Sequence, residues 1–186
     1  MLNLRMTCSR LAFAAALTAA LLTTAACRGK HSPAAVKNEE VQESGPKISS
    51  AVKMGDAASA DQLLRGFYAL EGNAWRWTAG TFTVLLRPPL AAAQHGATLH
   101  LSCSIPDVVI QKLKATTLTA GIGATRLGSE TFRNPGACTF SAPVPPELLS
   151  GETVTVDFKL DKTLPPTPED KRELGLIAVE ISLESK

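Results

Sequence analysis

An alternation of apolar and polar residues begins near residue 80 and continues to the end of the chain. In GETVTVDFKL, the apolar residues fall at every second position from Val154 to Leu160. A period of two is typical of strands that bury one face, and Gly and Pro separate the runs at short intervals. The pattern predicts an all-β fold, an antiparallel two-sheet sandwich of jelly-roll or immunoglobulin-like type, with an open barrel as the alternative. The predicted strands lie in residues 80–89, 96–106, 116–127 (two strands), 137–144, 151–160 and 174–184.

Two proline-led segments interrupt this alternation. They are PDVVIQKLK, residues 106–114, and PPELL, residues 145–149. Proline suits the first turn of a helix, because its fixed φ matches the helix and its missing N–H has no partner there in any case. We therefore expect one or two short helical turns among the strands.

The first 26 residues have the pattern of an export signal. Arg5 and Arg10 stand within the first ten residues, and an apolar run follows from Leu11 to Ala26 and ends in small residues. The run is shorter than the roughly 20 residues that a helix needs to span a bilayer. Residues 1–26 are therefore predicted to be a signal peptide, and a short transmembrane anchor is the alternative.

The segment TTAAC, which ends at Cys27, resembles the lipobox of bacterial lipoproteins. The resemblance implies that Cys27 becomes the first mature residue and carries the lipid, palmitate included, that anchors the protein to a membrane. Arg28, rather than Asp, follows the cysteine, and by the same resemblance this favours the outer membrane, with the domain in the periplasm. The alternative is ordinary signal cleavage nearby, which gives a soluble periplasmic protein.

Residues 28–60 differ in composition from the strands that follow them. They contain no aromatic residue and few large apolar ones. Such a segment buries too little surface to offset the entropy that ordering it costs, so we expect a flexible tether. The predicted organisation is a signal peptide (1–26), a lipidated Cys with its tether (27–60) and a β-sandwich domain (61–186).

Charge and motifs narrow the function classes. With 19 Lys and Arg against 17 Asp and Glu, the formal net charge of +2 gives no basis for expecting a nucleic-acid partner. The sequence has no G-x-S-x-G nucleophile elbow and no glycine loop of the kind that cradles phosphates. His100 and Cys103 lack the second ligand pair that a metal site needs. We therefore predict no catalytic residues, no metal and no cofactor, and so a protein that is not an enzyme.

Cysteine usage predicts one disulfide. Of the four Cys, Cys8 lies in the signal and Cys27 is the expected lipid site. Cys103 and Cys138 remain as a pair in an exported domain, each within a predicted strand, and such pairs are commonly bonded. Two separate buried thiols are the alternative.

Two segments at opposite ends of the predicted domain carry a resemblance. GFYALEGNAWRWT (66–78) and PEDKRELGLIAVEISL (168–183) resemble the opening and closing motifs of small bacterial β-sandwich domains. Those accessory domains are often appended to glycosyltransferases and other polysaccharide-related proteins. The resemblance covers essentially the whole domain and implies its sandwich fold.

The first of these segments holds the only Tyr and both Trp residues of the chain. Trp75 and Trp77 are two residues apart, so in a strand they share one face, with Asn73 beside them and Arg76 on the other face. One interpretation is a flat platform that stacks on sugar rings, with Asn73 and Arg76 as further candidate ligand contacts. The other is that the aromatic side chains fill the core.

A more specific prediction separates the two indoles. A bulge at Gly80 would shift the strand phase by one residue and bring Trp77 onto the same face as Phe82. Trp77 is therefore predicted to be a core residue. Trp75 follows the turn-like sequence EGN and is predicted to be the ligand contact.

Glu71 and Arg172 belong to the two motifs that carry the resemblance. Because the first and last strands of sandwiches commonly lie close together, we expect a charge-assisted bond between them that locks the ends of the domain, with a ligand role as the alternative. The sequence as a whole predicts a membrane-tethered, non-catalytic envelope lipoprotein that recognises a glycan or a protein partner. The competing hypotheses are a purely structural subunit of an envelope complex and, less favoured, an enzyme with an unrecognised site.

Overall fold

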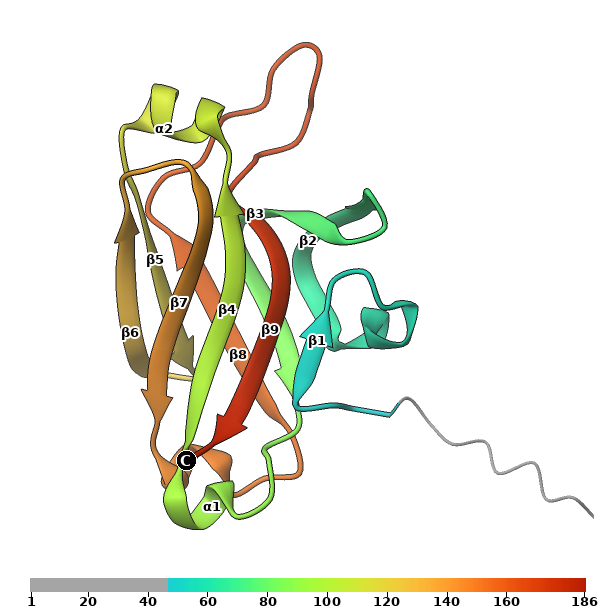
Figure 1. Cartoon of the computed structure of the whole chain (residues 1–186), viewed down its shortest axis with the longest axis vertical. Coiled ribbons are helices and arrows are strands. Elements are labelled where there is room, and N and C mark those ends of the chain that lie inside the picture. The colour runs from blue at the N-terminus through green and yellow to red at the C-terminus, as the bar shows by residue number, and fades with distance from the viewer. Residues whose placement is uncertain (1–46) are drawn as a thin grey trace, which may run out of the picture. The chain divides into compact units, whose positions relative to one another are not determined.

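The computed structural model describes residues 47–186, and the predicted signal peptide, Cys27 and the first part of the tether lie outside them (Figure 1). Nine of the thirteen described elements are β-strands and all strand pairs are antiparallel, which confirms the predicted fold class. The elements are β1 (Ala51–Lys53), the 3-10 helix η1 (Ala57–Gln62), β2 (Leu63–Glu71), β3 (Trp75–Leu86), α1 (Ala92–His95), β4 (Ala97–Ile105), α2 (Asp107–Leu113), β5 (Thr116–Ile122), β6 (Thr125–Phe132), β7 (Gly136–Val144), the 3-10 helix η2 (Pro146–Leu149), β8 (Val154–Leu160) and β9 (Ile177–Ser185).

The strands form two sheets that share β3. Hydrogen bonds link the strands in the order β6-β5-β8-β3-β9-β4-β7, with β2 beside β3 and β1 beside β9. We call β1, β9, β4, β7 and the first residues of β3 the front sheet, because β9, β4 and β7 lie in front of β5 and β8 in Figure 1. The back sheet consists of β2, the rest of β3, β8, β5 and β6. The sandwich therefore arises from one hydrogen-bonded path that folds over at β3.

Strand β3 passes from one sheet to the other between Thr78 and Thr81. Arg76 and Trp77 pair with β9, and from Thr81 onward the strand pairs with β8. Thr78 and Phe82 are both fully buried, so the alternation runs through Gly80 without a change of phase. The pairing of β3 with β2 is irregular near Gly80: Arg65 is opposite Thr83 and Phe67 is opposite Thr78, so the additional residues at this shift lie in β3. The irregularity does not produce the predicted change of phase.

Strand β9 contains a bulge that the sequence did not reveal. Ser102 of β4 is opposite Glu180, whereas Cys103 is opposite Ala178, so Val179 is the additional residue. The bulge moves the apolar alternation by one position. Ala178 and Ile181 are buried, and Val179 is 40% exposed. As a result, Glu180 and the alternate residues after it point away from the core.

The folded domain begins earlier than predicted. Val52 and Met54 are completely buried, and β1 pairs with β9. The buried Gln62 side chain accepts a hydrogen bond from the Ser49 N–H and donates to the carbonyl oxygens of Ser49 and Leu85. The prediction of a flexible tether up to residue 60 is therefore wrong for residues 49–60. A three-residue strand is too short to produce an alternation that can be recognised in the sequence.

The core combines aromatic contacts between the sheets with a covalent link within one of them. Phe82 and Phe158 stack with ring centroids 4.8 Å apart, and Phe140 of the front sheet meets Phe158 edge-on at 6.4 Å. Cys103 and Cys138, directly opposite each other on β4 and β7, form the predicted disulfide, with a Cα–Cα distance of 5.0 Å. The disulfide thus ties two neighbouring strands of the front sheet.

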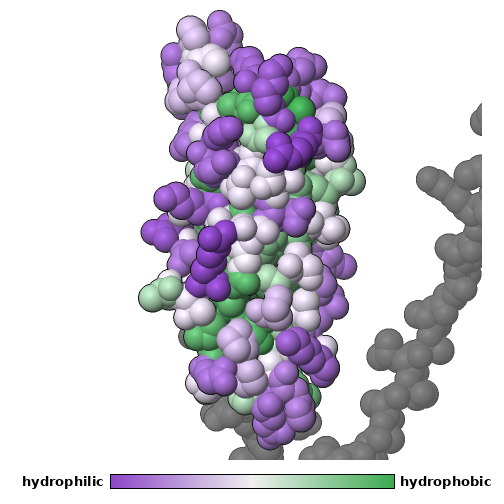
Figure 2. Space-filling model, turned by 90° about the vertical axis from the view of Figure 1, so that its left-hand side faces the viewer, coloured by the Kyte–Doolittle hydropathy of each residue, from purple (hydrophilic) through white to green (hydrophobic). Residues whose placement is uncertain are grey.

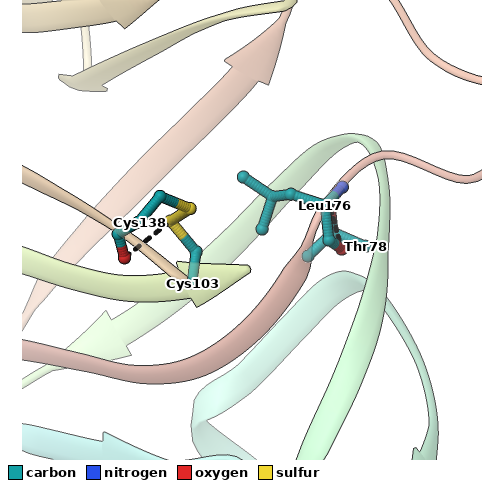
Figure 3. The surroundings of a disulfide bond; sticks show 4 residues. All are labelled: Thr78, Cys103, Cys138 and Leu176. Carbon is teal, nitrogen blue, oxygen red and sulfur yellow. Dashed lines mark hydrogen bonds between the residues drawn. A yellow bond between two sulfur atoms is a disulfide. The ribbon is translucent and has the colours of Figure 1, made fainter. Parts of the chain in front are cut away.

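A hydrogen-bonded corner lies beside this disulfide. The Thr78 backbone N–H and hydroxyl both donate to the Leu176 carbonyl oxygen, and the Leu176 N–H donates to the hydroxyl oxygen. Figure 3 shows the Leu176 side chain extending from this corner toward the sulfur atoms. The corner fixes the start of β9 at the point where β3 changes sheets.

The helices are short, and α1 and α2 lie at opposite ends of the sandwich, whereas η1 lies at its side beside β1 (Figure 1). The two predicted helical turns are confirmed as α2 and η2, whereas α1 and η1 were not predicted. In Figure 1, α2 lies at one end and α1 at the other. Among the described residues, no helix has the length and apolar character that a membrane span requires.

Candidate functional site

The outer face of the front sheet is an open, polar surface. Residues that pair on neighbouring strands lie on the same face of a sheet. The residues between them along each strand point to the other face, and in β4 these include Leu99 and Leu101, which are buried in the core. No helix lies in front of β9, β4 and β7 in Figure 1. The register gives four rows across this face: Trp77–Ile177–Ser104–Ala137, Lys53–Glu180–Ser102–Thr139, Ala51–Ser182–His100–Ser141 and Glu184–Thr98–Pro143.

Two shallow hollows on this surface meet at Glu180. The first has a volume of about 200 Å³ and is lined by His100, Leu101, Ser102, Thr139, Glu180, Ser182 and Glu184. The second, of about 410 Å³, lies where the end of β1 meets the β2–β3 turn, and its lining includes Lys53, Ala74, Val179 and Glu180. Because Glu180 lines both, the two hollows adjoin at this residue. We call the two hollows together the front groove.

The polar side chains of the front groove have few partners within the protein. No hydrogen bond joins the side chains of Ser102, Thr139, Glu180 or Ser182 to any other residue in the part of the chain that the structure describes. His100 Nε2 lies 3.7 Å from Glu184 Oε2. Polar groups without an internal partner can exchange solvent for a ligand, although Ser182 is itself buried, with 8% of its surface exposed.

Two half-buried indoles lie at one end of this face. Trp77 is opposite Ile177, and Trp75 precedes it by two residues on the same side of β3. A Cβ atom on Gly72 would lie 3.1 Å from Nε1 of Trp75, so that indole folds back over its own hairpin turn. Trp77 packs against the margin of the core without being fully buried. The fully buried aromatic residues are phenylalanines such as Phe82 and Phe158.

The other two predicted contacts lie in different surroundings. Asn73 is exposed, adopts the left-handed conformation with φ 54° and forms the β2–β3 turn together with Gly72. Arg76 lies on the opposite face of β3, beside the buried Ala178, and donates from a terminal guanidinium nitrogen to the Tyr68 carbonyl oxygen at 3.0 Å. The structure therefore keeps Asn73 near the indoles but does not bring Arg76 to them. The Nε of Arg76 is buried without a hydrogen-bond partner among the described residues.

Glu71 and Arg172 form an ion pair, with 2.8 Å between Oε1 and a guanidinium nitrogen. The same guanidinium forms a bidentate pair with Asp170 and stacks over the Tyr68 ring, 5.4 Å from its centroid. Hydrogen bonds from Arg172 lower the pKa of Asp170 to about 2, and the two carboxylates raise the pKa of Arg172. This cluster joins the segment before β9 to the β2–β3 hairpin. Sequence reasoning missed Asp170 and Tyr68, although the D-x-R spacing was a usable signal.

Large apolar side chains do not gather on the described surface. The exposed ones are Leu64 on β2, Leu90 before α1, Val108 on α2 and Val179 on β9, which belong to separate elements. Figure 2, which views the β5–β6 side, shows polar residues interspersed with small apolar areas. Isolated apolar side chains of this kind are normal for a soluble surface. Within residues 47–186, no group of three or more His, Cys, Asp or Glu side chains is arranged to hold a metal ion.

The molecule is thus an antiparallel β-sandwich with an uncovered sheet face. No protein-family model matches the chain, and no curated protein matches it in sequence. Solved structures with a similar fold include a carbohydrate-binding module, CBM4, with 11% identity and a TM-score of 0.36 over 78% of this chain and 91% of the other. Another contains CBM51-1, CBM51-2 and the M60 catalytic domain of Clostridium perfringens ZmpB (10% identity, TM-score 0.35, 75% of this chain and 14% of the other).

A third similar structure holds CBM51-2 in complex with GlcNAc, together with INT domains of the same Clostridium perfringens protein. It has 11% identity and a TM-score of 0.35, over 75% of this chain and 29% of the other. At such identities, the ligand of this chain has to be argued from its own residues.

Proposed function

We propose that this protein is a non-catalytic glycan-recognition module of the cell envelope, held at the membrane by a lipid on Cys27. The observation that carries the proposal is the front groove, whose hydroxyl and carboxylate groups lack partners within the described protein and which has two half-buried indoles beside it. Sugars present hydroxyls that donate and accept hydrogen bonds, and apolar ring faces that stack on aromatic side chains. A row of small polar residues beside indoles meets both requirements.

The dimensions of the face favour an oligosaccharide over a single sugar. The outer residues of β9 extend from Ile177 to Glu184, which at about 3.3 Å per residue corresponds to roughly 20 Å. The surface is also open instead of enclosed, so a chain can continue beyond either end. Open, polar surfaces suit weak binding along a polymer, and the scattered exposed apolar residues give less support to a large protein interface.

Membrane attachment rests on the N-terminal sequence. The apolar run before TTAAC and the arginine after Cys27 support lipidation and the outer membrane as the destination. Replacing Cys27 by Ala should abolish incorporation of labelled palmitate and release the domain into the soluble fraction. Continued labelling of Cys27→Ala would contradict the lipid site, without bearing on glycan binding.

Glycan binding can be tested through the chain's own fluorescence. Both Trp residues lie at one end of the front face, so all tryptophan emission reports on this region. We expect envelope oligosaccharides to change the emission of the full chain and Trp75→Ala to weaken the binding. Thr119→Ala, on the outer face of the back sheet, is the matched control and should bind as the parent does. Absence of binding to every glycan would overturn the proposal, and a protein that co-purifies through the front face would then favour protein recognition.

A further inference from the structure

The front face carries more acidic than basic side chains. Glu180, Glu184 and Asp56 are the carboxylates that line the front groove, and Lys53 is the one lysine in its rows. His100 lies close to Glu184, and the four rows contain no arginine. Proteins usually hold carboxylate or sulfate groups with arginine or lysine donors. The face is therefore poorly equipped to bind an acidic sugar.

The Glu180 carboxylate is the acceptor on this face that most clearly lacks a hydrogen-bond donor. It is half-buried and lines both hollows of the front groove. Although Lys53 stands opposite it in register, the two form no ion pair, and the Glu180 carboxylate has no hydrogen bond to a described residue. An ionised carboxylate only accepts hydrogen bonds, so a ligand that pairs with Glu180 has to donate.

We propose that the front groove selects glycans that carry free amino groups, with an ammonium group paired to Glu180. This inference rests on the proposed function and specifies its ligand class. An ammonium group offers three donors, and its charge-assisted hydrogen bond to a carboxylate is stronger than a bond between neutral groups. The flanking hydroxyls of Ser102 and Thr139, in the same row, remain free for the sugar's own hydroxyls.

The second carboxylate fits a ligand with repeating charges. Glu184 lies on the same outer face, four residues beyond Glu180 and roughly 13 Å along β9. Ser182 lies between them and lines the same hollow. A polymer of amino sugars presents ammonium groups at intervals along its length, so one chain lying along β9 can reach both carboxylates.

The experiment compares three oligosaccharides of equal length: a glucosamine oligomer with free amino groups, its fully N-acetylated form and a uronic acid oligomer. Tryptophan emission of the full chain is titrated with each at low salt and near pH 6, where the amines are protonated. We expect the amino form to bind about tenfold more tightly than the acetylated form, which corresponds to one charge-assisted hydrogen bond. Added salt should reduce this preference, because it screens the charges.

Three variants identify the groups responsible. Glu180→Gln should remove the preference for the amino form, because it weakens binding of that form more than binding of the acetylated form, and it should leave the melting temperature unchanged. Lys53→Gln should increase the preference, because it removes the competing cation. Asp157→Asn, which changes a carboxylate on the back sheet, is the control and should keep the preference of the parent.

The outcomes distinguish this inference from the function on which it rests. Equal binding of the amino and acetylated forms, or a preference that survives in Glu180→Gln, would overturn the inference and leave glycan recognition standing. A preference for the uronic acid that disappears in Lys53→Gln would overturn it in favour of an acidic ligand. Failure to bind these oligomers and every other glycan would overturn the proposed function as well.

Discussion

The outer faces of the two sheets are both polar, but they use their polar side chains differently. On the back sheet, Arg65 donates to Thr83 and Asp157, and the Thr83 hydroxyl is 2.6 Å from the same Asp157 oxygen. Thr117 and Thr131 form a further hydroxyl pair on neighbouring strands. On the front sheet, the corresponding row from Glu180 to Thr139 contains no such bonds among the described residues. The back face pairs several of its polar groups internally, whereas the row from Glu180 to Thr139 on the front face pairs none among the described residues.

This difference shows why polarity alone does not identify a binding surface. A hydroxyl that is already paired gains little from a ligand, because binding must first break the internal bond. A hydroxyl that is paired only to water exchanges one hydrogen bond for another and can contribute to affinity and specificity. The comparison therefore predicts that substitutions on the back sheet change stability and those on the front groove change binding.

The largest expected effect comes from Gly66, on which the position of β2 at the back sheet depends. Gly66 has φ 76°, and a Cβ there would overlap the Thr81 carbonyl oxygen and lie 2.7 Å from Phe82 Cα. Gly66→Ala should lower the free energy of unfolding by about 3–5 kcal/mol, the sum of backbone strain and overpacking. Gly123→Ala is the control, because φ is also positive there but a Cβ meets nothing within 4 Å. Equal losses in urea unfolding would show that the steric contact at Gly66 is unimportant.

The next effect concerns the disulfide, which ties β4 to β7 in the front sheet. The bond closes a loop between residues that are 35 apart in sequence, so its loss should lower the free energy of unfolding by about 3–4 kcal/mol. The measurement compares unfolding of the parent and of Cys103→Ala/Cys138→Ala, each with and without reductant. Reductant should destabilise the parent alone. A parent that is indifferent to reductant would contradict a stabilising role.

Substitution of each of the two tryptophans at the end of the front face should affect stability and binding differently. Trp77→Ala should lower the free energy of unfolding by about 2–3 kcal/mol, somewhat less than truncation of a fully buried aromatic side chain, because Trp77 packs at the margin of the core. Trp75→Ala should cost less than 1 kcal/mol, as expected of a residue outside the core cluster, and should weaken glycan binding. Thermal melting of both variants, together with the glycan titration, tests whether Trp77 contributes mainly to stability and Trp75 mainly to binding. A larger loss of stability for Trp75→Ala would reverse the assignment.

The smallest effects test the comparison most directly, with one carboxylate from each sheet. Asp157→Asn disrupts an exposed pair with Arg65 and should cost at most about 1 kcal/mol of stability without changing binding. Glu180→Gln should change stability by less than about 0.5 kcal/mol, since it breaks no internal bond, but should alter ligand preference. The melting temperature and the ligand preference are measured for each of the two variants. If Asp157→Asn changes the ligand preference, the proposed division of roles between the faces is wrong.

Much of the fold could be predicted because alternation is a local signal. The run from Val154 to Leu160 has every second residue buried, as the period of two requires. The disulfide could be predicted because the domain was expected to be exported, and because Cys8 was assigned to the signal peptide and Cys27 to the lipid site. Neither prediction needed knowledge of which strands pair.

The features that were missed depend on pairing. The bulge at Val179 exists only relative to β4, and β1 is held by β9 and Gln62 instead of by any pattern of its own. The same holds for the candidate site, because the front groove appears only when the register brings Ser102 and Thr139 beside Glu180. The indoles were recognisable from composition, but the unpaired state of these polar groups was not.

The position of β1 has a mechanical consequence under the proposed attachment through Cys27. A pull on the chain before Lys47 would reach β1 first, where it is resisted by the three-residue pairing of Ala51–Lys53 with β9, the burial of Val52 and Met54, and the hydrogen bonds of Ser49 and Ser50. The strands behind it are joined by much longer pairings and a covalent bond. Tension would therefore detach β1 and carry Lys53 away from Glu180 before the sandwich gave way. In the proposed arrangement, β1 would therefore be a weak mechanical link at the edge of the front groove.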